Sequence, residues 1–232
     1  GFTFTLAAPV GQDFTWNGGA AANWNTTDAS WLYNNAASVW YDYNNAIFST
    51  ENATATLTEN AIAASLSFTQ PATIVGSAVL TVPAVAVAPN VSATISAPTG
   101  GALEKTGAGT LTLGSSRTDV TTLSAGTLEI NGDGTTLDWS KFKFGTGNTL
   151  RVAGGASITY DNYIIVGDTA NNNATLEITG ASSKVVSTAI YMSIGDKANT
   201  SGTVTLTDGG KYENTGGGHD GGGLIVGSKG AG

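Results

Sequence analysis

The stretch YIIVGDTANNNATLEITG, Tyr163–Gly180, is followed 28 residues later by YMSIGDKANTSGTVTLTD, Tyr191–Asp208. A third copy begins at LIVGSKGAG, Leu224–Gly232. A period of this size is typical of proteins in which each copy forms one structural unit and stacks on the next. The repeat therefore predicts that Ile178 lies beside Leu206, and Val166 beside Ile194, on successive turns of the chain.

Short segments that alternate apolar and polar residues recur from about Thr54 onward, and such alternation predicts strands with one buried face. Their leading residues lie 17, 22, 26 and 28 residues apart in the later part of the chain: Leu111, Leu128, Leu150, Leu176 and Val204. Hairpin strands would return after about 8 to 12 residues. The longer intervals favour parallel strands stacked about 4.8 Å apart. No helix is predicted.

The composition narrows the classes of function. The chain has no Cys, which excludes disulfides, thiol catalysis and Cys-based metal sites. Its net charge is −8, and its nine Lys and Arg residues are scattered singly from Lys105 onward, which argues against a nucleic acid partner. No basic residue precedes Lys105 and no apolar run could span a bilayer. We expect a mature, exported segment, extracellular or on a bacterial cell surface, without a signal peptide.

The segments LEKTGAGTLTLGSS, Leu103–Ser116, and LSAGTLEI, Leu123–Ile130, carry a more specific pattern. They resemble the autotransporter-associated β-strand repeat, whose motif is matched here by Leu103, Lys105, Gly107, Gly109, Thr110, Leu111, Leu113, Gly126, Thr127, Leu128 and Ile130. The linker RTDVTTL departs from the family, whose members usually carry a Tyr and Gly pair there. The resemblance implies an all-β, right-handed parallel β-helix (β-solenoid) from a secreted or surface-displayed bacterial protein. It implies no catalytic residue.

Residues 1–50 differ from the solenoid repeats expected over residues 51–232, because most of the aromatic residues lie in this first segment. Two roles are open for them. Buried aromatics would cap the first coil, whose open strand edges and apolar cross-section need covering. Exposed aromatics would stack on sugar rings or contact another subunit. The candidates for such contacts are Trp16, Trp24, Trp31, Trp40, Tyr41 and Tyr43.

Two sets of polar residues are candidates for chemistry. Asp168 and Asp196 occupy equivalent repeat positions, so a carboxylate pair on adjacent coils could act as acid and base or bind Ca²⁺. However, Asp after Gly is a common turn residue. His219 precedes Asp220 in a Gly-rich segment without an assignable nucleophile, which favours a surface loop. Trp139 is interpreted as a packed corner between coils.

The main hypothesis is a structural protein of the cell exterior that serves as a stalk, scaffold or filament subunit, with adhesion as a second duty. The alternative is a carbohydrate-binding module that uses the N-terminal aromatics, and the third is a polysaccharide lyase or hydrolase. We expect no enzyme activity, no cofactor and no metal. The last coil is expected to be continued, either by a longer chain or by head-to-tail docking of another copy.

Overall fold

The computed structural model describes residues 10–138, 142–144, 147–161, 163–167, 173–188, 191–195, 200–215 and 223–226. Within these ranges the chain forms β-strands and contains no helix, which confirms the all-β prediction. Almost all strand pairs are parallel; the exceptions are two pairs near the N-terminus.

The first sheet has eleven strands. Its main path runs, in spatial order, through β18 (Phe142–Phe144), β15 (Thr121–Leu123), β13 (Leu103–Thr106), β10 (Ala84–Val87), β7 (Ala61–Phe68), β5 (Asn44–Phe48), β1 (Asp13–Trp16), β3 (Trp31–Tyr33) and β4 (Ala36–Ser38). Two short strands lie off this path, β9 (Leu80–Thr81) beside β7 and β12 (Thr99–Gly100) beside β9. The pairs β1 with β3 and β3 with β4 are antiparallel.

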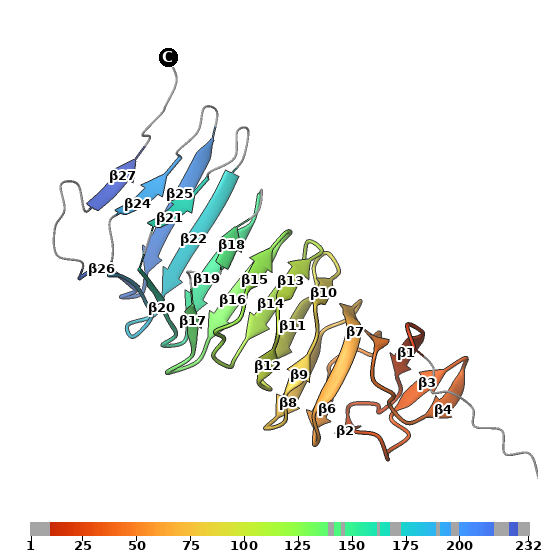
Figure 1. The fold of residues 1–232 in the computed structure, drawn as a ribbon. Helices are drawn as coiled ribbons and strands as arrows, with labels where there is room; N and C mark the ends of the chain where they lie inside the picture. Colours follow the sequence, from red (N-terminus) through yellow and green to blue (C-terminus); the bar gives the residue numbers. More distant parts are fainter. Residues whose placement is uncertain are drawn as a thin grey trace, which may run out of the picture.

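The second sheet has nine strands, and all of its pairs are parallel. They are, in spatial order, β2 (Ala21–Trp24), β6 (Ala53–Leu57), β8 (Ala72–Gly76), β11 (Ser92–Ile95), β14 (Thr110–Leu113), β16 (Thr127–Asn131), β19 (Thr149–Ala153), β22 (Asn173–Thr179) and β25 (Ser201–Thr207). The spatial order follows the chain order, so each pass of the chain adds one strand to the edge of this sheet (Figure 1).

Two smaller parallel sheets complete the later part of the chain. The third sheet contains β17 (Thr136–Asp138), β20 (Ser157–Tyr160), β23 (Lys184–Ser187) and β26 (Lys211–Asn214). The fourth contains β21 (Tyr163–Val166), β24 (Tyr191–Ile194) and β27 (Gly223–Val226). None of the four sheets closes on itself.

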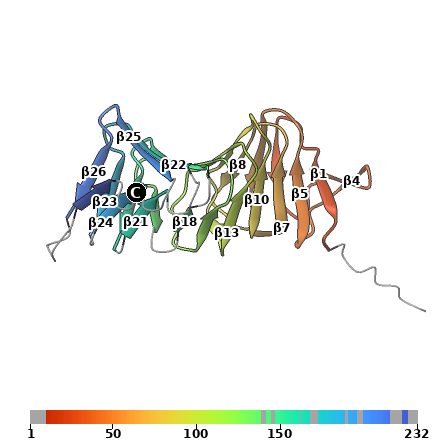
Figure 2. The ribbon, with the colours of Figure 1, turned by 90° about the horizontal axis from the view of Figure 1, so that it is seen from above.

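A change of sheet divides the stack into two parts. The first sheet ends at β18. Later in the chain, β20 joins the third sheet, and the strand that follows it, β21, starts the fourth sheet. Seen from above, the parts before and after this change are inclined to one another around β18 and β22 (Figure 2). The second sheet runs without interruption through both parts and therefore joins them.

The predicted stacking of the repeats is confirmed by the strand register. Leu111 pairs with Leu128, Leu128 with Leu150, Leu150 with Leu176, and Leu176 with Val204. The four leucines are fully buried and form one continuous apolar row. The register also pairs Ile178 with Leu206 and Val166 with Ile194, as the repeat predicts.

The outward rows of the second sheet are polar. One consists of hydroxyl residues in register on six successive strands: Ser92, Thr110, Thr127, Thr149, Thr175 and Thr203. β-branched Thr fits the pleated surface and can pair with Thr across strands. The alternation of these rows with the leucine row gives each strand its buried and solvated faces.

Candidate functional site

The four N-terminal tryptophans form a buried aromatic cluster. Trp24 and Trp31 are 0% exposed, Trp40 is 1% and Trp16 is 2%. Ring centroids lie 4.8 Å apart for Trp24 and Trp31 and 4.9 Å apart for Trp31 and Trp40, in edge-to-face or tilted orientations that favour aromatic pairs. The interpretation of these four residues as carbohydrate or subunit contacts is therefore corrected, because neighbouring rings cover the faces that a sugar would need.

The cluster continues into the stack as an aromatic row. Trp16 stacks on Phe48 with centroids 5.3 Å apart, and Phe48 stacks on Phe68 at 5.2 Å. These residues lie on β1, β5 and β7, and the register pairs Phe48 directly with Phe68. On the other side of β1, Trp31 of β3 pairs with Trp16. The aromatics thus fill the core where the antiparallel strands β3 and β4 cover the first parallel strand.

Tyr41 and Tyr43 are placed differently from the tryptophans. They are 39% and 55% exposed and lie on either side of Asp42, in the turn that leads into β5. Tyr43 has a backbone φ of +66°, in the left-handed region that bulky residues avoid. These two residues are the exposed members of the predicted aromatic set.

Hydrogen bonds from buried groups hold this turn. The Asp42 carboxylate accepts from Trp40 Nε1 at 3.0 Å and from the Ile62 backbone N–H at 2.9 Å. The amide of Asn44, which is fully buried, donates to the Tyr41 carbonyl at 2.9 Å. The Tyr43 N–H donates to the Ile62 carbonyl at 2.8 Å. The turn is therefore fixed to β7 and to the tryptophan cluster.

A row of polar side chains follows the turn on the outer face of the first sheet. The register pairs Asp13 with Asn45 and Asn45 with Ser65. Asn45 Nδ2 donates to Asp13 Oδ1 at 2.9 Å, and Ser65 Oγ donates to Asn45 Oδ1 at 2.8 Å. Carboxylate, amide and hydroxyl groups thus form one connected chain, whose middle member, Asn45, follows Tyr43 by two residues in the sequence.

Lys105 of the repeat motif is a buried structural cation. It is 0% exposed and occupies a core row of the first sheet whose preceding members are Phe14, Ala46, Leu66 and Val85 and whose next member is Leu123. Its ammonium donates to the carbonyls of Thr106, Gly107 and Ala125 at 2.9, 2.7 and 2.9 Å. Burial lowers the pKa of Lys105 to about 8. The ammonium joins two successive passes of the chain at their turns.

The motif glycines have a related packing role. Gly107 has a φ of +74°, and a Cβ added there would lie 2.3 Å from the Val87 carbonyl oxygen. A Cβ on Gly109 would lie 2.2 Å from the Ala88 carbonyl oxygen. Contacts this short are not tolerated, so these positions need Gly for the close approach of the preceding pass. The motif residues therefore act in packing.

Arg117 lies in the linker that departs from the family pattern, and no feature of the sequence assigned it a role. Its side chain is buried, and the residue is 2% exposed. Nε donates to Thr121 Oγ1 at 3.1 Å, one terminal nitrogen to Thr99 Oγ1 at 2.5 Å, and the other to the Gly101 carbonyl at 2.6 Å. The guanidinium thus connects the linker to the preceding pass, 16 to 18 residues earlier in the chain.

An open cavity of about 360 Å³ lies beside Arg117. It is lined by Thr118, by Thr136–Asp138 of β17 and by Thr159–Asp161 at the end of β20. The Arg117 donors point to the internal acceptors named above, and the Tyr160 hydroxyl lies 2.8 Å from that of Tyr212. Two of the polar side chains in the wall, those of Arg117 and Tyr160, are thus engaged in contacts with neighbouring passes.

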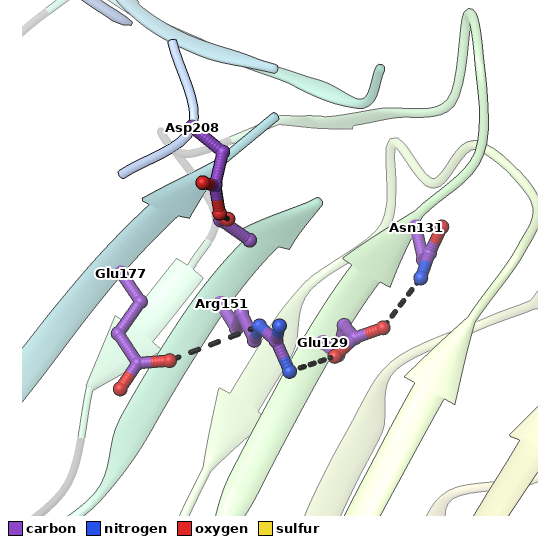
Figure 3. A network of polar contacts seen from close by, with 6 residues as sticks. Glu129, Asn131, Arg151, Glu177 and Asp208 are labelled. Carbon is purple, nitrogen blue, oxygen red and sulfur yellow. Dashed lines mark hydrogen bonds and ion pairs between the residues drawn. The ribbon is translucent and has the colours of Figure 1, made fainter. Parts of the chain in front are cut away.

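A charged row crosses the outer face of the second sheet. Arg151 lies between its register partners Glu129 and Glu177, with nitrogen–oxygen distances of 3.2 and 3.8 Å (Figure 3). Asn131 donates to Glu129 at 2.5 Å, and farther along the sheet Thr179 donates to Asp208 at 3.1 Å. Alternating charges on adjacent strands favour this register over a slipped one.

Several predicted site residues lie outside the described part of the chain: Asp168, Asp196, His219 and Asp220, together with Trp139. Among the residues that the structure does describe, no cluster of three or more His, Asp or Glu side chains could hold a metal ion. The same residues include no helix long and apolar enough to cross a membrane.

Three comparisons with known proteins complete this description of the site. The chain matches no protein-family model, no curated protein and no solved structure.

Proposed function

We propose that this chain is a structural β-solenoid, a right-handed parallel β-helix of the autotransporter-associated repeat type that serves as a stalk, scaffold or filament subunit outside a bacterial cell. The observation that carries the proposal is the unbroken register of the second sheet, in which nine strands follow one another in chain order. A protein built this way grows in one dimension, because each pass contacts mainly its neighbours.

The use of polar residues supports a structural role. Lys105 and Arg117 are both buried, and their described hydrogen bonds go to carbonyl and hydroxyl groups of the chain itself. A catalytic cation would have to direct donors toward a substrate. Among the described donors, Lys105 instead reaches Ala125, and Arg117 reaches Thr99 and Gly101, on neighbouring passes.

The edge of the second sheet supports the proposal that another strand continues it. Among the described strands, β25 pairs with β22 on one side and is the last of that sheet, and Leu206 on β25 is 48% exposed. An apolar, unpaired edge is a template for a further strand. We propose that this strand comes either from a continuation of the polypeptide or from the β2 end of another copy, in a head-to-tail arrangement that forms filaments.

Small-angle scattering and light scattering over a range of concentrations test both parts of this proposal. The scattering curve should fit an elongated, rod-shaped particle. A curve that fits a compact β-sandwich would overturn the proposed solenoid.

If copies stack head to tail, particle mass should rise with concentration, and Leu206→Arg should abolish the rise. Thr205→Arg is the matched control, because Thr205 lies one residue away on the outward row. Monomers at all concentrations would exclude self-association. Labelling of intact cells with antibodies tests the location.

A further inference from the structure

The geometry points to a binding site for a neutral polysaccharide at the N-terminal end of the stack, with Tyr43 as the stacking residue and the row Asp13–Asn45–Ser65 as its polar side. This inference goes beyond the structural role proposed above and does not depend on it. The proposed site lies on the exposed turn that precedes β5, and the buried tryptophans are not part of it.

The backbone of Tyr43 is the first observation. Among the described residues, six other than Gly have positive φ; five are Asn or Asp, which tolerate this region, and the sixth is Tyr43 at +66°. The turn at Asn52, which precedes β6 as Tyr43 precedes β5, has Asn at a φ of +56°. Tyr43 therefore occupies a position where Asn would be less strained, and strain of this kind is concentrated at functional positions.

Packing does not account for the tyrosine. Tyr43 is 55% exposed, so more than half of its surface remains in solvent despite the strained backbone. Tyr33, by contrast, stacks on Phe14 with centroids 5.0 Å apart and planes within 9°. Phe14 also contacts Tyr41 edge-on, at 6.2 Å between centroids. Tyr33 and Tyr41 are thus supported by ring contacts with Phe14, whereas Tyr43 is the more exposed of the two turn tyrosines.

The turn is also preorganised. Asp42 and the Tyr43 N–H make hydrogen bonds to Trp40 and to Ile62 of β7, and Asn44 closes the turn with a hydrogen bond to the Tyr41 carbonyl. The Tyr43 carbonyl accepts from the Gly11 N–H at 2.8 Å, which holds the segment before β1 against the turn. A ligand would not have to order this backbone, and preorganisation of this kind raises affinity.

The chemistry of the surroundings selects the class of ligand. A sugar ring presents an apolar C–H face that stacks on an aromatic ring, and hydroxyls that both donate and accept. The side chains of the row Asp13–Asn45–Ser65 are hydrogen-bonded to one another, and a sugar hydroxyl would use the carboxylate oxygen and the hydroxyl lone pairs that these two bonds leave. With Asp13 and Asp42 beside the turn and a net charge of −8, the surface repels polyanions. The ligand is therefore a neutral glycan rather than an acidic one.

The test uses the whole chain and four neutral hexasaccharides as probes, namely cellohexaose, laminarihexaose, mannohexaose and chitohexaose, with hexagalacturonate as the acidic comparison. Titration calorimetry should detect binding of at least one neutral probe and none of the acidic one. Tyr43→Asn should weaken that binding at least tenfold while the melting temperature stays equal or rises, because Asn suits the left-handed backbone.

Two further variants complete the design. Asn45→Ala should weaken binding of the same probe several-fold through the polar row. Val120→Asn, at a residue that is 38% exposed on a later pass, should leave binding unchanged. The inference is overturned if no neutral probe binds, if Tyr43→Asn binds like the wild type, or if Tyr43→Asn lowers the melting temperature, since the last result would make Tyr43 a packing residue.

Discussion

Ile178 and Leu206 are register partners on adjacent strands, yet Ile178 is 0% exposed and Leu206 is 48% exposed. Both occupy the inward row of the second sheet. The difference arises because β22 has a neighbour on each side, whereas β25, among the strands that the structure describes, pairs only with β22 in that sheet. The two residues therefore allow the burial of one row to be compared at its middle and at its edge.

Ile178→Asp should lower the free energy of unfolding by about 4 kcal/mol or more, because it places an unpaired carboxylate in an apolar row. Leu206→Asp should cost about 1 kcal/mol or less on the monomeric chain, since water reaches that side chain. Urea unfolding followed by tryptophan fluorescence measures both values. Glu177→Ala and Thr205→Ala, on the outward row, should change little. Equal losses at positions 178 and 206 would contradict the exposure difference.

Lys105→Met should destabilise the chain by about 1 to 3 kcal/mol at pH 7, because three carbonyl groups lose their shared donor in a buried place. The pH dependence of the free energy of unfolding tests this role of Lys105. Lys105 releases its proton near pH 8 in the folded chain and near 10.5 when unfolded, so the unfolded state binds more protons between these values. Stability contributed by this group therefore rises with pH over that window.

Urea unfolding at intervals from pH 7 to 10.5 would show this rise in the wild type and its loss in Lys105→Met. Lys184→Met is the matched control, because Lys184 forms an ion pair with Glu213 at the surface and its side chain is 43% exposed. That variant should keep the wild-type slope. A slope that persists in Lys105→Met would assign the titration to another group.

Arg117→Lys should lower the free energy of unfolding by about 1 to 3 kcal/mol, because one ammonium cannot reproduce the planar fork that reaches Thr99, Gly101 and Thr121 together. Arg151→Lys is the surface comparison and should cost about 1 kcal/mol or less. Thermal unfolding of both variants measures and compares these two losses of stability. Equal melting temperatures for the two would show that the Arg117 contacts add no stability.

Tyr160→Phe should cost about 1 kcal/mol, because it removes the hydroxyl contact to Tyr212, 52 residues later in the chain. Burial raises the pKa of Tyr160 well above its ordinary value of 10.0, so above pH 10 the folded chain keeps a proton that the unfolded chain loses. Stability contributed by Tyr160 thus falls as pH rises above 10. Unfolding measured at pH 10 to 11.5 should show a shallower fall in the variant, and an unchanged fall would refute this assignment.

The register of the later passes could be predicted from the sequence because its signal is local and periodic. The row from Leu111 to Val204 follows from the position of one leucine in each alternating segment, whatever the lengths of the intervening loops. Lys105 carries a usable signal too. It lies two residues after Leu103, in the inward phase of its strand, and a Lys in that phase must have hydrogen-bond partners for its ammonium.

Other features could not be predicted because they depend on contacts between distant residues. The acceptors of Arg117 lie up to 18 residues away, and no local pattern marks them. The exposure of Leu206 depends on the number of neighbouring strands, although its sequence environment matches that of Ile178. Composition could not separate the buried tryptophans from Tyr41 and Tyr43, because that division follows from the path of the chain through a turn with an unusual φ.

The register of the second sheet also bears on how such a chain changes length during evolution. Removing residues 176–203 would join Thr175 to Val204, and Val204 would then take the place of Leu176 beside Leu150. Inserting a duplicate of the same 28 residues would add one strand to each of three sheets. Gain or loss of a whole repeat therefore preserves every other pairing, whereas a deletion of odd length within a strand turns its apolar side chains outward. The number of 28-residue repeats can thus change while the register of the remaining strands stays the same.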